Sequence, residues 1–114
     1  MNNYYLQLVV LENCPYSNAA LELVKPLENK TNIIKVNQTN KDNYKTDDIS
    51  SFPQIYLKKY NSNGSLLLGG YTDLKSFYET FQNQPYSEKN VNEFLKKYNK
   101  WSKKSTLRLI QLIN

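Results

Sequence analysis

The chain has 114 residues, a formal net charge of +5, one cysteine and no histidine. This length suits a single domain with a modest hydrophobic core. The composition excludes, within the chain, an internal disulfide, a Ser-His or Cys-His catalytic pair and a histidine metal site. No apolar run is long enough to span a membrane and no charged-then-apolar leader begins the sequence, so we expect no membrane partner and a reduced, cytoplasmic setting.

The positive charge is unevenly distributed along the chain. Residues 1–81 contain eight lysines and eight acidic residues, and are therefore neutral overall. Residues 82–114 contain six lysines, one arginine and two glutamates, so all of the net charge of +5 lies there. We expect a core domain over residues 1–81 and a basic helical extension over residues 82–114, which is packed on that domain or tethered to it.

The first residues predict a strand followed by a helix. Residues 4–11 are apolar and β-prone, whereas residues 18–24 have the composition of a helix. Pro15 suits the first helical position, where its missing N–H costs nothing and its φ is already set. Pro26 either ends this helix or kinks its last turn.

A second strand and a polar segment follow. Residues 33–36 predict a short strand, parallel to the first because a helix connects the two. The segment 37–51 offers few apolar anchors, and we place a short helix near residues 40–48. Residues 54–60 then predict a third strand.

A hairpin and an amphipathic helix complete the first 81 residues. The turn 61–64 ends in Asn-Gly, which supplies the positive φ values of hairpin turns, so residues 65–68 should pair antiparallel with the third strand. Thr72 is suited to cap the next helix. That helix has four apolar residues at the spacing of one face: Leu74, Phe77, Tyr78 and Phe81.

The extension predicts two more helices. We expect a linker over residues 82–86 and a helix that is capped by Ser87 and runs to about Lys100. A short last helix is expected over residues 107–113. The cations here offer contacts for an anionic surface or a nucleic acid, but lysine-rich amphipathic helices are usually solvated faces of their own domain, and we do not expect nucleic acid as a partner. The helix that Ser87 caps has one apolar stripe: Val91, Phe94, Leu95 and Tyr98.

Cys14 lies where the first strand should end and the first helix should begin. There the thiol faces unpaired backbone N–H groups and the positive end of the helix dipole. This setting favours the thiolate, which is the nucleophilic form of cysteine. The alternative is a buried structural cysteine, a common fate of this residue type. Position alone does not decide between the two.

The order β-α-β-α-β-β-α, with a cysteine at the first strand–helix junction, is that of a thioredoxin fold. Within residues 4–81, three stretches together resemble the glutaredoxin family: Cys14-Pro15-Tyr16-Ser17, Ser51-Phe52-Pro53-Gln54-Ile55 and Gly69-Gly70-Tyr71-Thr72-Asp73-Leu74. The resemblance implies an α/β protein of thioredoxin-like fold, with a central four-stranded mixed sheet flanked by helices and the C-terminal helical extension added to it. It also implies that Cys14 is catalytic, in an active-site motif completed by Pro15, Tyr16 and Ser17.

The other two stretches would bind glutathione if the resemblance holds. In glutaredoxins the proline that matches Pro53 is cis and lies beside the catalytic sulfur, so that the backbone of Phe52 pairs with the cysteinyl part of glutathione. Gly70 allows the ligand to approach the backbone. Thr72 and Asp73 then receive the γ-glutamyl carboxylate at a helix N-terminus, and the Asp73 side chain pairs with the γ-glutamyl ammonium. The alternative for Thr72 and Asp73 is a helix cap and a dipole partner, and both roles are compatible.

The chain departs from the family pattern in three places. Ser17 replaces the second cysteine of dithiol members, so only a monothiol route remains. Leu11 stands where the family usually has a lysine that contacts the glycyl carboxylate of glutathione; Lys41 or Lys45 would have to make that contact instead. The segment before Pro53 is shorter than in typical members.

The resemblance implies a monomeric, glutathione-dependent thiol-disulfide oxidoreductase that uses glutathione as co-substrate and reduces glutathionylated proteins or small mixed disulfides. A first alternative is a [2Fe–2S] cluster, held between two subunits by one cysteine and one glutathione from each. Family members that do this most often have Gly-Phe in place of Pro15-Tyr16, which favours catalysis here. A second alternative is a redox-inert binding module whose basic tail docks an acidic partner.

Overall fold

A four-stranded mixed sheet forms the centre of the protein. The computed structural model describes residues 3–83 and 87–114, so most of the expected 82–86 linker lies outside the described residues. Short 3₁₀ segments, η1 and η2, interrupt the regular elements. In chain order the elements are β1 (Tyr4–Leu11), α1 (Pro15–Val24), η1 (Lys25–Lys30), β2 (Thr31–Val36), η2 (Lys41–Tyr44), β3 (Gln54–Lys59), β4 (Ser65–Gly69), α2 (Tyr71–Phe81), α3 (Glu88–Lys97) and α4 (Lys103–Ile113).

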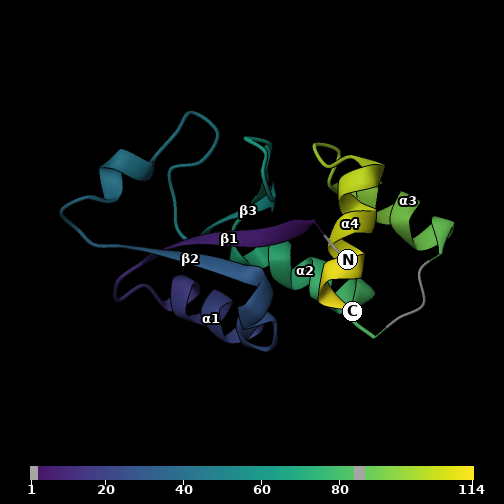
Figure 1. Ribbon diagram of the computed structural model, residues 1–114, viewed down its shortest axis with the longest axis horizontal. Helices are drawn as coiled ribbons and strands as arrows, with labels where there is room; N and C mark the ends of the chain where they lie inside the picture. The colour runs from purple at the N-terminus through teal and green to yellow at the C-terminus, as the bar shows by residue number, and fades with distance from the viewer. Residues whose placement is uncertain (1–2, 84–86) are drawn as a thin grey trace.

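The strand order is β2-β1-β3-β4, with β1 parallel to β2 and antiparallel to β3, and β4 antiparallel to β3. The parallel pair is joined through α1, as its crossover requires. One face of the sheet presents Leu6, Leu8 and Val10 to the helices, and these residues share one hydrophobic cluster with α1, α2 and the extension. The predicted fold class, a thioredoxin-like α/β layout with a C-terminal helical extension, is confirmed (Figure 1).

The second face of the sheet has no long helix over it among the described residues. The expected helix near residues 40–48 is wrong in length: only η2 forms, and the segment around it loops away on the side opposite α1 and α2 (Figure 1). Gln54, buried on this face, donates from Nε2 to the Tyr44 carbonyl at 2.8 Å. Gln54 alternates with the core residue Ile55 along β3, and its register partner on this second face is Val9 of β1, which is also buried.

Two details of the hairpin and of α2 differ from expectation. The positive φ of the turn lies at Asn61 (57°) and not at the Asn-Gly pair, where the Ser62 hydroxyl accepts from the Gly64 N–H. The N-cap of α2 is Gly70 and not Thr72, which is the second residue of the helix. The reason is Asp73, whose carboxylate accepts the Gly70 N–H at 2.9 Å, so that the helix starts two residues earlier than a threonine cap would place it.

The extension forms two helices whose bounds differ slightly from those expected. Ser87 caps α3 by accepting the Asn90 N–H, as predicted, but α3 ends at Lys97. The last helix begins earlier than residue 107, because Ser102 caps it by accepting the Ser105 N–H. In the part of the chain that the structure describes, no helix combines the length and apolar character needed to cross a membrane.

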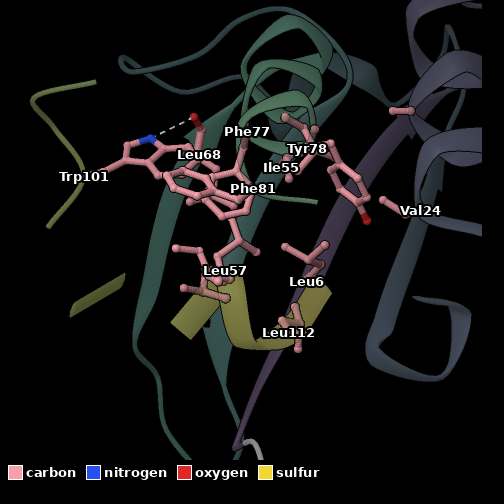
Figure 2. Close-up of a cluster of buried hydrophobic side chains, with 14 of the residues drawn as sticks. Leu6, Val24, Ile55, Leu57, Leu68, Phe77, Tyr78, Phe81, Trp101 and Leu112 are labelled. Carbon is pink, nitrogen blue, oxygen red and sulfur yellow. Dashed lines mark hydrogen bonds between the residues drawn. The ribbon is translucent and has the colours of Figure 1, made fainter. Parts of the chain in front are cut away.

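An aromatic cluster joins the extension to the sheet and to α2. Trp101, between α3 and α4, is 5% exposed and packs with ring centroids 5.6 Å from Phe77 and 5.0 Å from Phe94. Its indole Nε1–H donates to the Leu68 carbonyl of β4 at 3.2 Å, the dashed line in Figure 2. Val91, Leu109 and Leu112 belong to the same hydrophobic cluster as the sheet, so the core is continuous across both parts of the chain.

Tyr78, on the buried face of α2, carries a hydroxyl that has no hydrogen-bond partner among the described residues. Burial raises its pKa to about 12. We expect Tyr78→Phe to raise the free energy of unfolding by about 1 kcal/mol, because the variant keeps the ring and removes a desolvated polar atom. Urea unfolding measures this, with the half-exposed Tyr60→Phe as the control that should not change stability.

The same substitution should show a pH dependence. An unfolded tyrosine ionises at about pH 10, below the raised pKa of about 12 in the folded state. Tyr78 therefore contributes a loss of stability as the pH rises from the first value to the second, and the phenylalanine variant lacks this contribution. A stability difference that stays constant with alkaline pH would contradict the burial of this hydroxyl.

Candidate functional site

Cys14 is the N-cap residue of α1, with extended backbone angles (φ −103°, ψ 119°) and Pro15 directly after it. The preceding turn is closed by Asn13, which has a positive φ of 60°, and by the Cys14 N–H donating to Leu11 at 3.3 Å. Asparagine tolerates this region better than most residues. The sequence thus holds the thiol at the end of β1, against the first turn of α1, as predicted.

The environment of Cys14 favours its thiolate. Partial burial is the largest single influence and opposes ionisation. It is outweighed by hydrogen bonds to the sulfur from the Ser17 N–H, the Ser17 hydroxyl and the Tyr16 N–H, which together hold the pKa of Cys14 below its ordinary value. These donors belong to the first turn of α1, where backbone N–H groups have no partner within the helix.

Ser17 also ties the strand to the helix. Its side chain is fully buried, and Oγ accepts the Leu11 N–H at 3.0 Å. The hydroxyl can accept this bond and donate its own proton to the Cys14 sulfur at the same time. Ser17 therefore both joins β1 to α1 and stabilises the thiolate form of Cys14.

We expect Ser17→Ala to raise the pKa of Cys14, because the thiolate loses one donor while burial continues to oppose ionisation. The rate of Cys14 alkylation should then rise with pH at a more alkaline position than in the wild type. Asn18→Ala, an exposed neighbour on the same helix, is the matched control and should leave the profile in place. An unchanged profile for Ser17→Ala would show that backbone donors alone hold the thiolate.

The Phe52–Pro53 peptide bond lies beside the thiol and is cis, the configuration that the resemblance implied. Cys14 Sγ is 3.9 Å from the Phe52 carbonyl oxygen. Strand directions explain why Cys14 and Phe52 lie close together. Because β3 runs antiparallel to β1, the start of β3 and the end of β1 lie at the same edge of the sheet. β4 runs antiparallel to β3, which brings Gly69 and the start of α2 to that edge as well.

An open groove of about 590 Å³ is lined in part by Phe52 and Pro53, and Cys14 itself is not among its lining residues. Three parts of the chain that are far apart in sequence contribute to its lining, together with Tyr16, whose ring is 63% exposed and has its centroid 6.3 Å from that of Tyr71. These parts are Asp48, Ile49 and Ser51 to Pro53; Leu67 to Asp73; and Lys97 to Trp101. The groove is large enough for a small peptide.

The turn from Gly69 to Asp73 shapes one side of this groove. Gly69 has a φ of 126°, a conformation that side chains disfavour, and a Cβ there would collide with the Asp73 carboxylate. Asp73 is held by the Gly70 N–H, and no side chain caps the first N–H groups of α2. Thr72 is exposed beside them. The turn therefore presents a fixed carboxylate next to free backbone donors.

The structure does not bring Lys41 and Lys45 to this groove. Both lie on or next to η2, and neither is among the residues that line the cavity. Lys45 pairs instead with Asp42, Nζ to Oδ1 at 2.9 Å, which lowers the pKa of that carboxyl. The sequence did not predict that Lys97 to Trp101 line the groove. The only signal for it was the lone tryptophan within a strongly basic segment.

A [2Fe–2S] cluster takes four ligands, of which Cys14 could supply one. The chain has no histidine and no other cysteine, and the described residues contain no group of three or more metal-binding side chains. The donor set of one chain therefore does not fit a cluster, and any such site would need three ligands from outside it.

The candidate site is thus a thiolate-stabilising helix N-terminus, a cis-proline backbone beside it, and a groove with a fixed carboxylate. Neither a protein-family model nor a curated protein matches the chain. Its function has to be inferred from the chemistry of this site.

Proposed function

We propose that the protein is a glutathione-dependent thiol-disulfide oxidoreductase of the glutaredoxin type, with Cys14 as its nucleophile. The observation that carries the proposal is the position of the Cys14 sulfur: its pKa is lowered at the start of α1, and it lies 3.9 Å from the carbonyl oxygen of Phe52, a residue that lines the groove. A structural cysteine needs no stabilisation of its thiolate.

The reaction proceeds in two exchange steps. The Cys14 thiolate attacks the glutathione sulfur of a mixed disulfide, a new S–S bond forms between Cys14 and glutathione, and the other sulfur leaves as a thiolate that takes a proton. A second glutathione thiolate then attacks the glutathione sulfur bound to Cys14. Glutathione disulfide is released, and the Cys14 thiolate is restored. Together the two steps convert the mixed disulfide and one free glutathione into the released thiol and glutathione disulfide, so that one S–S bond is broken and one is formed.

The groove supports the binding of the glutathione half. The backbone of Phe52 faces the sulfur and can pair with the cysteinyl part like an added strand. The Asp73 carboxylate and the uncapped N–H groups of α2 offer partners for the ammonium and the carboxylate of the γ-glutamyl group. Because reduced glutathione must be present and the single thiol must stay free, we place the protein in a reducing compartment such as the cytoplasm.

The deciding experiment is turnover of the mixed disulfide of glutathione and 2-mercaptoethanol, in the presence of glutathione, glutathione reductase and NADPH. The proposal expects NADPH consumption that depends on the amount of protein and on both thiol substrates. Consumption no faster than in buffer would overturn it.

We expect Asp73→Asn to reduce kcat/KM for this mixed disulfide by about tenfold, because a charge-assisted contact with the γ-glutamyl ammonium is lost. Asparagine retains an oxygen that can accept the Gly70 N–H, so urea stability should hardly change. Asp73→Ala removes both contacts and should lower activity similarly and stability by about 1 kcal/mol. If Asp73→Asn has wild-type kinetics and only Asp73→Ala has an effect, Asp73 is a helix cap alone.

A further inference from the structure

One side of the groove is built by the extension. Lys97 to Trp101 line the cavity beside the turn from Gly69 to Asp73. Trp101 fixes this segment, because its indole donates to the Leu68 carbonyl at 3.2 Å and its ring is buried in the aromatic cluster (Figure 2). The segment from Lys97 to Trp101 is therefore anchored to the hydrophobic core through Trp101, which contacts β4 one residue before Gly69.

Lys97 and Lys100 bring two positive charges to this side of the groove. Both side chains are exposed, and neither takes part in an ion pair with the described residues. Lys97 Nζ lies 5.6 Å from the centroid of the Tyr98 ring, a contact that orients the ammonium without neutralising it. Lys103, by contrast, already pairs with Glu88 at 2.9 Å. Two unneutralised ammonium groups at a groove attract a carboxylate.

The same groove holds the Asp73 carboxylate, which the Gly70 N–H fixes in place. A carboxylate and free ammonium groups within one groove match a ligand that carries both charges on one carbon, which is the head group of an α-amino acid. The γ-glutamyl end of glutathione is such a group. A purely acidic peptide would meet Asp73 as a repulsive neighbour.

We infer that Lys97 and Lys100 bind the γ-glutamyl carboxylate of the glutathione half of a mixed disulfide, while Asp73 receives its ammonium. The extension is then part of the substrate site. This inference rests on the proposed function, and it assigns substrate selection to residues outside the part of the chain that resembles glutaredoxins.

The test compares two small mixed disulfides of 2-mercaptoethanol, one with glutathione and one with cysteinylglycine, which lacks the γ-glutamyl group. Mass spectrometry follows the rate at which Cys14 takes up the peptide half. The double variant Lys97→Gln/Lys100→Gln should react roughly two- to thirtyfold more slowly than wild type with the glutathione compound, the range for two exposed charge contacts. It should react at the wild-type rate with the cysteinylglycine compound.

The matched control is Lys96→Gln/Lys104→Gln, which removes the same charge from exposed lysines of the extension that do not line the groove. It should leave both rates unchanged. Equal rates for wild type and Lys97→Gln/Lys100→Gln, or equal losses with both compounds, would overturn this inference and leave the proposed function standing. A third substrate, an acidic peptide that carries glutathione on a cysteine, tests the other half of the disulfide. If Lys97→Gln/Lys100→Gln reacted more slowly only with this peptide, the lysines would bind the peptide half, and the inference would be wrong. If wild-type Cys14 takes up glutathione no faster than free cysteine does, the proposed function itself fails.

Discussion

We expect the Cys14→Ser variant to lose all turnover of a small glutathione mixed disulfide. The chain has no second thiol, and a serine hydroxyl is not ionised near neutral pH, so no nucleophile remains at the start of α1. The pKa of Cys14 is held down by donors on Ser17 and Tyr16, and this stabilisation has no use without the sulfur. The measurement is NADPH consumption coupled to glutathione reductase.

The variant is also informative because it should fold. Cys14 occupies the N-cap of α1, and serine is among the preferred residues at that position, so urea stability should equal or exceed that of the wild type. Loss of activity can then be assigned to the chemistry of the thiol. If Cys14→Ser retained activity, Cys14 would not be the nucleophile, and the proposed function would be wrong. Loss of both activity and stability would instead favour the structural reading of this cysteine.

Most of the fold could be predicted because its elements carry strong local patterns. The first strand matches its expected range, 4–11, and the buried face of α2 is the one that its spacing predicts. The helix expected near 40–48 was wrong in length because only Tyr44 and Ile49 could anchor it, and the segment forms only the short η2. The start of α2 differs from the predicted start because Asp73, the third residue of the helix, accepts the Gly70 N–H and makes Gly70 the N-cap.

The candidate site was predictable where strand direction decides it. Cys14 follows β1, Pro53 precedes β3 and Gly69 ends β4, so alternating strand directions bring these three positions to one edge of the sheet. The contribution of Lys97 and Lys100 was not predictable in this way. It depends on long-range contacts, which are the packing of Trp101 against Phe77 and the indole bond from Trp101 to a carbonyl 33 residues away, and a sequence pattern does not reveal such contacts.

Trp101→Ala should lower the free energy of unfolding by about 3–5 kcal/mol, the range for removing a large buried aromatic side chain. The substitution leaves a cavity between Phe77 and Phe94 and removes the partner of the Leu68 carbonyl. Because a domain of this size is stable by only about 5–15 kcal/mol, the variant should unfold at a much lower urea concentration. Far-ultraviolet circular dichroism follows the transition, since the variant has no tryptophan to report fluorescence.

Trp101→Phe separates the two contributions of this side chain. It keeps an aromatic ring against Phe94 and removes only the N–H donor and part of the volume, so it should cost about 1–2 kcal/mol. In both variants a single transition is expected, because the extension and the sheet share one hydrophobic cluster. If Trp101→Ala instead keeps the main transition at the wild-type urea concentration and adds a second, weaker one, the extension folds as a separate unit. The positions of Lys97 and Lys100 at the groove would then depend on a contact that opens independently of the sheet.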